Sequence, residues 1–157
     1  MIFPITLFVL SWICFFIFAD KKKYFLFAPT CYVALIFGLA SDILVLHYPF
    51  LWDYPAATKG PLLLKHLMDD FGAIFVFTYL FLQTLPKKQT IIMLSRHIFY
   101  WTLIGISIEL IAFKTGNFKY GPWWNLGYSF VADVIFLFVF YGYYKLHKKY
   151  TEVSPPV

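Results

Sequence analysis

Apolar residues fill five long stretches of the chain, and short polar segments separate them. A run of about 17 to 25 apolar residues is long enough to cross the hydrocarbon core of a bilayer as an α-helix. The pattern therefore predicts an all-α integral membrane protein, a bundle of five transmembrane helices that forms one domain over residues 1–149. A polar tail follows at 150–157. The predicted spans are residues 3–19, 24–48, 61–85, 90–113 and 126–146.

The composition agrees with a protein that faces lipid. Hydrophobic residues make up 61% of the chain and charged residues only 13%, which is too little polar surface to cover a water-soluble globule. The chain also holds 20 Phe, 12 Tyr and 5 Trp, and aromatic rings suit both acyl chains and the headgroup boundary. The lipid bilayer is therefore the first expected partner.

The formal net charge of +5 raises the question of a nucleic-acid partner. Five spans place the lysines of 21–23, 87–88 and 145–149 on one face of the membrane. With Arg96, that face holds nine basic residues against four on the other, which are Lys59, Lys65, Lys114 and Lys119. The positive-inside rule then predicts an N-terminus outside and a C-terminus in the cytoplasm. This bias explains the charge, so no nucleic-acid partner is expected.

Every predicted helix from the second to the fifth contains an acidic residue. Counted from the outer ends of the spans, these acids lie roughly 7 to 13 Å deep at the helical rise. Inserting each one costs on the order of 2 to 3 kcal/mol or more unless it is paired, protonated or hydrated. We therefore expect one polar layer near the outer face, in which His66 flanks both Asp69 and Asp70 from the same helix. The candidate binding residues are Asp42, His66, Asp69, Asp70, Glu109 and Asp133.

Small residues at helical spacing indicate that these acids face the interior of the bundle. Gly38 lies four residues before Asp42, and Gly105 lies four residues before Glu109. Each glycine therefore shares a helix face with its acid. A small residue on that face lets a neighbouring helix approach closely.

Three interpretations of the polar layer are open. In the first, the acids are structural: they hydrogen-bond between helices, and Lys65 pairs with Asp69. In the second, the acids and His66 form a cavity, open to the outside, for a proton, a metal cation or a cationic solute. In the third, the chain is a metal-dependent membrane enzyme that acts on a lipid-linked substrate. The candidate metal ligands are His66, Asp70, Glu109 and Asp133.

The motifs of the chain favour a protein that is not an enzyme. The adjacent aspartates lack the repeated, spaced pattern that membrane prenyl and phospholipid transferases use to hold diphosphate through magnesium. The sequence also contains no HExxH, GxSxG, Walker or GxGxxG pattern, and it names no cofactor. We therefore expect a small binding or transport component. A protein partner or a second copy of the chain is expected as well, because five short helices rarely enclose a complete translocation path.

Aromatic residues crowd the two predicted outer loops, whereas the predicted cytoplasmic turns contain no Trp. Such residues form either an interfacial belt or a cover over the polar layer. The candidates for this aromatic cover are Trp52, Tyr54, Tyr120, Trp123 and Trp124.

The order of several motifs resembles a known family. The motifs are Asp42 late in the second helix, DYP at 53–55, Asp70, IEL with Glu109, and KYGPWWNLGYSF at 119–130. Together they resemble an uncharacterised family of small multi-pass, five-helix integral membrane proteins of endospore-forming Gram-positive bacteria. The resemblance covers residues 38–145. It implies five helices and a location in the bacterial cell membrane, and it brings no established activity.

Overall fold

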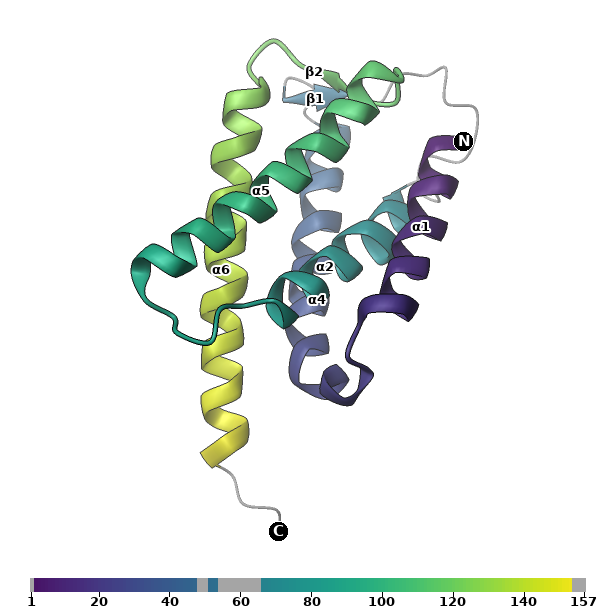
Figure 1. The fold of residues 1–157 in the computed structure, drawn as a ribbon. Coiled ribbons are helices and arrows are strands. Elements are labelled where there is room, and N and C mark those ends of the chain that lie inside the picture. The colour runs from purple at the N-terminus through teal and green to yellow at the C-terminus, as the bar shows by residue number, and fades with distance from the viewer. Residues whose placement is uncertain (1, 48–50, 54–65, 154–157) are drawn as a thin grey trace.

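The computed structural model describes residues 2–47, 51–53 and 66–153. Of these residues 83% are helical, so the chain is all-α. The helices alternate in direction, as Figure 1 shows. The turn after α1, the turn before α5 and the C-terminal end of α6 lie at one end of the molecule, here called the lysine end. The paired strands β1 and β2 lie at the opposite end, here called the strand end.

Besides helical residues 66–68, the described part of the chain contains seven helical segments and two short strands. They are α1 (Ile2–Phe18), the 3₁₀-helix η1 (Lys21–Lys23), α2 (Tyr24–His47), β1 (Trp52–Asp53), the π-helix η2 (Asp69–Ile74), α4 (Phe75–Gln83), α5 (Ile91–Lys114), β2 (Lys119–Tyr120) and α6 (Leu126–Val153). The strands pair antiparallel, with Trp52 opposite Tyr120. Residues 66–68, η2 and α4 form one continuous helix over residues 66–83, which is the third helix of the bundle.

Four helices begin or end close to the predicted spans. Helices α1, α2 and α5 each lie within one residue of prediction at both ends, and α6 begins at Leu126 as predicted. Residues 61–65 of the predicted third span fall outside the described residues. The fifth helix extends beyond the predicted span, which ends at residue 146, because α6 continues to Val153. Lys, Leu and Glu are good helix formers. The helix therefore continues through the polar residues that follow the apolar run.

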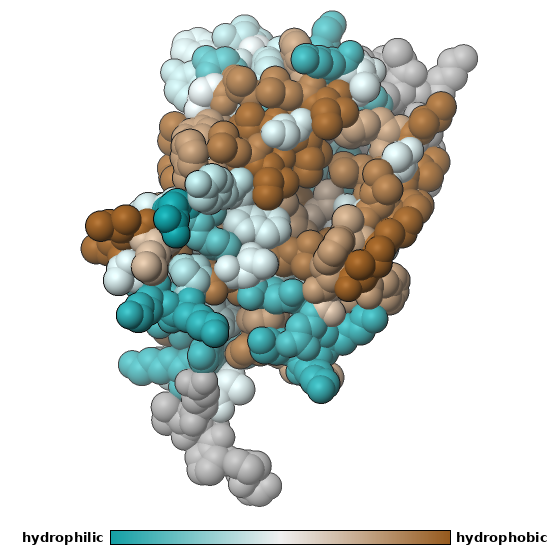
Figure 2. Space-filling model, viewed as in Figure 1, coloured by the Kyte–Doolittle hydropathy of each residue, from teal (hydrophilic) through white to brown (hydrophobic). Residues whose placement is uncertain are grey.

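Among the described residues, three helices are long and apolar enough to cross a membrane, over Lys21–Val45, Ile91–Lys114 and Leu126–Thr151. Helix α1 is also apolar but shorter. Figure 2 shows apolar side chains over much of the middle of one face, with polar side chains gathered toward its two ends. This arrangement suits a lipid surrounding. The crossing of all five helices and their orientation stay predictions.

The hydrophobic core lies around α4, which packs against α1, α2 and α6. Tyr79 and Phe81 of α4 are fully buried. The ring of Tyr79 lies 5.0 Å from that of Phe15 on α1 and 5.3 Å from that of Phe27 on α2, both edge to face. Edge-to-face pairs add to the stabilisation that burial provides. The third helix is therefore the central element of the bundle.

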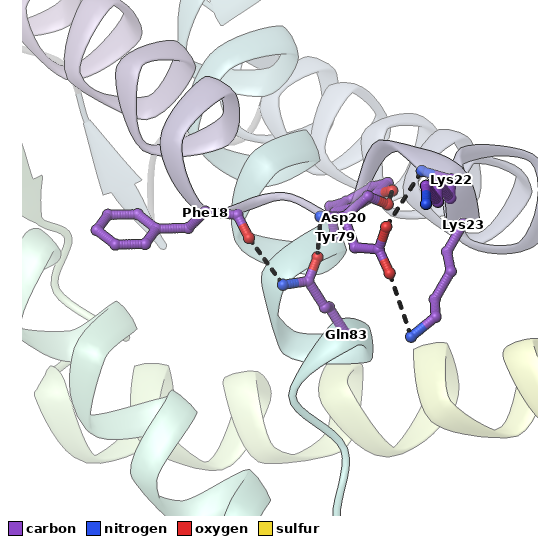
Figure 3. Close-up of polar contacts among 6 residues, drawn as sticks. All are labelled: Phe18, Asp20, Lys22, Lys23, Tyr79 and Gln83. Atoms are coloured by element: carbon purple, nitrogen blue, oxygen red, sulfur yellow. Dashed lines mark hydrogen bonds and ion pairs between the residues drawn. The ribbon is translucent and has the colours of Figure 1, made fainter.

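Hydrogen bonds fasten α4 to the connection between α1 and η1 at the lysine end (Figure 3). The Tyr79 hydroxyl donates to the backbone carbonyl of Asp20 at 2.7 Å. The Asp20 backbone N–H donates to Gln83 Oε1 at 2.7 Å, and Gln83 Nε2 donates to the carbonyl of Phe18 at 2.9 Å. Lys23 Nζ lies 3.4 Å from Asp20 Oδ2. Two side chains of α4 thus satisfy three backbone groups of this connection.

The helix ends near the strand end carry local capping motifs. Gly116 has φ +71°, its N–H bonds to the carbonyl of Phe113 at 3.1 Å, and the N–H of Asn117 bonds to the carbonyl of Ala112 at 2.9 Å. This pattern is a Schellman motif, which ends α5. Asn125 Oδ1 accepts N–H groups from the first turn of α6, as an N-cap residue does. The two caps set the path of the β2 connection.

Candidate functional site

The first polar group at the strand end joins α2 to the third helix. His66 Nδ1 forms an ion pair with Asp42 Oδ2 of α2. Asp70 lies near enough to both of these side chains to interact with them electrostatically. His66 is 3% exposed and Asp70 is 2% exposed. His66 therefore pairs with an acid on the neighbouring helix α2. The sequence predicts only that it flanks Asp69 and Asp70 of its own helix.

Gly38 provides the space for the Asp70 carboxylate. A methyl group added at Gly38 would lie 2.6 Å from Asp70 Oδ1 and 2.6 Å from Ile74 Cδ1. Atoms at such distances overlap, so any side chain larger than hydrogen would displace the acid. The sequence predicts that Gly38 lets a neighbouring helix approach. The structure shows that the group admitted there is a carboxylate.

The twin aspartates begin the π-helix η2. The N–H of Phe75 bonds to the carbonyl of Asp70, five residues earlier in the chain. π-Helical turns are rare and occur frequently at functional sites. Asp70 faces α2, whereas Asp69 lines a cavity beside α5. The turn thus directs two consecutive acids to two different neighbours, and no pattern in the sequence signals it.

The second polar group lies between α5, α6 and β2. The Tyr120 hydroxyl donates to Glu109 Oε1 at 2.6 Å, a length typical of a hydrogen bond to an ionised carboxylate. Asp133 of α6 faces Glu109. A methyl group added at Gly105 of α5 would lie 3.0 Å from Asp133 Oδ2. In both polar groups, a glycine on one helix makes room for an acid on the next.

Tyr120 stays a hydrogen-bond donor over a wide pH range. Burial raises the pKa of the Tyr120 phenol well above its usual range, and the hydrogen bond to Glu109 raises it further. Both causes favour the neutral phenol. Tyr120 therefore orients the Glu109 carboxylate without competing with it for negative charge.

A cavity of about 130 Å³ lies between the two polar groups. Asp69 from η2 and Glu109 from α5 both line it, together with Asn117 and the rings of Phe3 and Phe118. A space of this size holds several water molecules. The cavity thus places carboxylates from two helices in contact with one small volume.

Aromatic rings gather above the second polar group. The ring of Trp52 on β1 lies 5.2 Å from that of Trp124 and 6.5 Å from that of Phe118. Phe118 also packs edge to face on Tyr120 at 5.2 Å. Three predicted cover residues therefore meet here. Phe118 joins them, and it was missed because the sequence prediction weighed Trp and Tyr alone.

The remaining two residues of the predicted aromatic cover have different outcomes. Trp123 is 74% exposed, so it lies on the surface and does not close the site. Pro122 and Gly121 precede it in an exposed turn, which carries its side chain outward. Tyr54 lies outside the described residues.

The six candidate binding residues form two groups, with Asp69 and Glu109 meeting at the cavity between them. The four candidate metal ligands are divided, because His66 and Asp70 pack against α2, whereas Glu109 and Asp133 lie at the contact of α5 and α6. Within residues 2–47, 51–53 and 66–153, no three His, Cys, Asp or Glu side chains are placed to hold a metal ion. The described residues therefore do not bring the four candidate metal ligands together at one point.

The chemistry that this site offers is the exchange of protons and the attraction of cations. Its groups are carboxylates, an imidazole and a neutral phenol, all near the strand end. Comparison of the chain with protein-family models, with curated proteins and with solved structures finds no match. Function must therefore be inferred from the geometry of the site.

Proposed function

We propose that the chain is a multi-pass protein of the bacterial cell membrane whose five helices cross the bilayer, with the strand end outside. The gathering of lysines at the lysine end supports this orientation through the positive-inside rule. The family resemblance of residues 38–145 supports the same location. In this membrane, the chain is a small binding or transport component that takes up a cation or a proton at the strand end.

The cavity shared by Asp69 and Glu109 carries this proposal. Two carboxylates that line one small space favour the binding of a proton or a cation there. The rings of Phe3 and Phe118 in the cavity wall also suit an organic ammonium ion, which aromatic faces attract. A proton or a small cationic solute therefore matches both the charge and the walls of the cavity.

The orientation can be tested with reporter fusions. One fusion follows Pro86, in the turn between the third and fourth helices, and the other follows the last residue of the chain. Both reporters are expected to signal the cytoplasm. An extracytoplasmic signal at either place would overturn the proposed orientation.

Cation binding can be tested by thermal unfolding of the purified protein, because a ligand of the folded state raises its apparent stability. The probes are the chlorides of sodium, potassium, magnesium, calcium and methylammonium, over a range of pH. The variant is Asp69→Asn, and the matched control is Asp53→Asn, an exposed acid of β1. Stabilisation that the control retains and Asp69→Asn loses supports the proposal. Equal stabilisation of both variants, or none at all, contradicts it.

A structural role is the second candidate, because two contacts in the site each join two elements. The Asp42–His66 pair links α2 to the third helix, and the Tyr120–Glu109 bond links β2 to α5. In this case each acid variant lowers stability and no probe raises it. The same unfolding experiment therefore separates the two candidates.

A further inference from the structure

The geometry points to a proton, carried by Asp70, as the ligand of the Asp42–His66–Asp70 group. This inference rests on the proposed binding function at the strand end, and it names the ligand of one part of that site. It concerns the buried contact between α2 and η2, whereas the cavity of Asp69 and Glu109 lies on the other side of the π-helix.

Asp70 is a buried acid, and its Oδ2 atom has no hydrogen-bond partner among the described residues. Its side chain is 2% exposed, and among the residues that the structure describes, none bonds to Oδ2. Buried carboxylates are ordinarily hydrogen-bonded or paired with a cation. The unsatisfied oxygen therefore indicates that something is bound to this carboxyl group.

The charges around Asp70 favour its neutral form. The titratable groups near enough to Asp70 to act on it electrostatically are Asp42 from α2, and His66 and Asp69 from its own helix. His66 is already paired with Asp42, so a charged imidazole there is matched by one carboxylate. On the side of α1, the neighbour of the π-helix is the ring of Phe8, against Gly72. Among the described residues around Asp70, an ionised Asp70 would add a further negative charge next to Asp42 and Asp69.

The described residues leave no room for a larger ligand beside Asp70 Oδ1. The carboxylate lies against Gly38, where even a methyl group would come within 2.6 Å of Oδ1. Asp70 does not line the cavity that Asp69 shares with Glu109. In the described parts of the chain, no three His, Cys, Asp or Glu side chains are arranged so that they could hold a metal ion. A proton neutralises the carboxylate and needs no space of its own.

The bound proton links pH to the packing of two helices. When Asp70 loses its proton, like charges on η2 and α2 face each other across the Gly38 contact. Their repulsion weakens the contact at the strand end while the core around α4 stays packed. Asp70 thus makes this end of the bundle sensitive to rising pH.

Thermal unfolding of three variants across pH tests the inference. Asp70→Asn keeps the size of the protonated acid and cannot ionise, so its unfolding midpoint should equal that of the wild type at neutral pH and fall less at alkaline pH. Asp53→Asn should follow the wild type throughout. Asp42→Asn should lower the midpoint at neutral pH, because it removes the acid paired with His66. A loss in Asp70→Asn as large as that in Asp42→Asn would show that Asp70 is ionised, and it would overturn the inference.

Infrared spectroscopy provides a readout that does not depend on stability. The wild type should show a carboxylic-acid C=O band that disappears at alkaline pH, and this titration needs no variant. Asp70→Asn should lack that band, whereas Asp133→Asn, which removes the buried acid of the second polar group, should retain it. A spectrum without such a band overturns the inference. Cation stabilisation that depends on Asp69 is measured separately, so either proposal can fail while the other stands.

Discussion

The carboxylate of Asp70 packs directly against Gly38 on the neighbouring helix α2. Replacing this glycine by alanine should force the carboxylate and the side chain of Ile74 to move. Overpacking of this kind typically costs about 1 to 3 kcal/mol. We expect Gly38→Ala to lower the free energy of unfolding by an amount in this range, measured by denaturant unfolding in detergent micelles.

Gly142 on α6 is the matched control for this prediction, because nothing lies within 4 Å of a methyl group added there. Alanine is a better helix former than glycine by roughly 0.5 to 1 kcal/mol. Gly142→Ala should therefore leave stability unchanged or raise it slightly. Equal losses in the two variants would show that the Asp70 contact is not the cause.

Tyr120→Phe should remove the hydrogen bond to Glu109 and keep the ring. A hydrogen bond to a charged group contributes about 1.5 to 3 kcal/mol, and partial exposure favours the lower end of this range. Tyr128→Phe is the control, because the Tyr128 side chain is 56% exposed. Equal losses in the two variants would argue against the Glu109 bond.

The same pair of variants tests the pKa of Tyr120. Since burial raises the pKa of the phenol in the folded state, the folded state favours the neutral form. The stabilisation is complete below the ordinary tyrosine pKa of about 10, and it is lost as the pH rises above that value. Wild-type stability should therefore fall more steeply than that of Tyr120→Phe in strongly alkaline buffer. Parallel curves would contradict the assignment.

Any substitution that adds a β-carbon at Gly116 should have a conformational cost. Its φ of +71° is unfavourable for L residues by roughly 1 to 2 kcal/mol, and a methyl group there meets nothing within 4 Å. Gly116→Ala should therefore lower stability for a backbone reason alone. Gly116→Asn should lose less, because asparagine adopts this conformation more readily. A larger loss for asparagine would point to a steric cause.

Tyr79 and Gln83 should act together at the lysine end, because both bond to the backbone of Asp20. Tyr79→Phe removes one hydrogen bond, worth about 1 kcal/mol, while the ring stays in the core. We expect Tyr79→Phe and Gln83→Ala to be non-additive when combined, as neighbouring residues generally are. Unfolding free energies of the two single variants and the double variant form the required cycle. Strict additivity would indicate that the two bonds are independent.

The apolar runs predicted α1, α2 and α5 to within one residue, because the length of such a run is a direct signal for a helix in a membrane protein. The apolar run did not indicate where α6 ends, since helix formation continues through polar residues to Val153. Charge and spacing identified which acids lie inside helices. They did not identify the partner of each acid, because pairing across helices depends on how each helix is rotated about its axis. His66 shows this: its partner Asp42 lies on another helix.

The π-helix at 69–74 sets that rotation for the third helix. A π turn contains more residues than an α turn, and each residue of a helix advances by about 100° around the axis. Deleting one residue from this segment would therefore mainly rotate one end of the third helix relative to the other, and it would shorten the helix only slightly. If Tyr79 stayed in the core, Asp70 would be rotated away from Gly38 and toward another neighbouring helix. The proton site exists because the extra residue of the π turn rotates one end of the third helix about its axis relative to the other end.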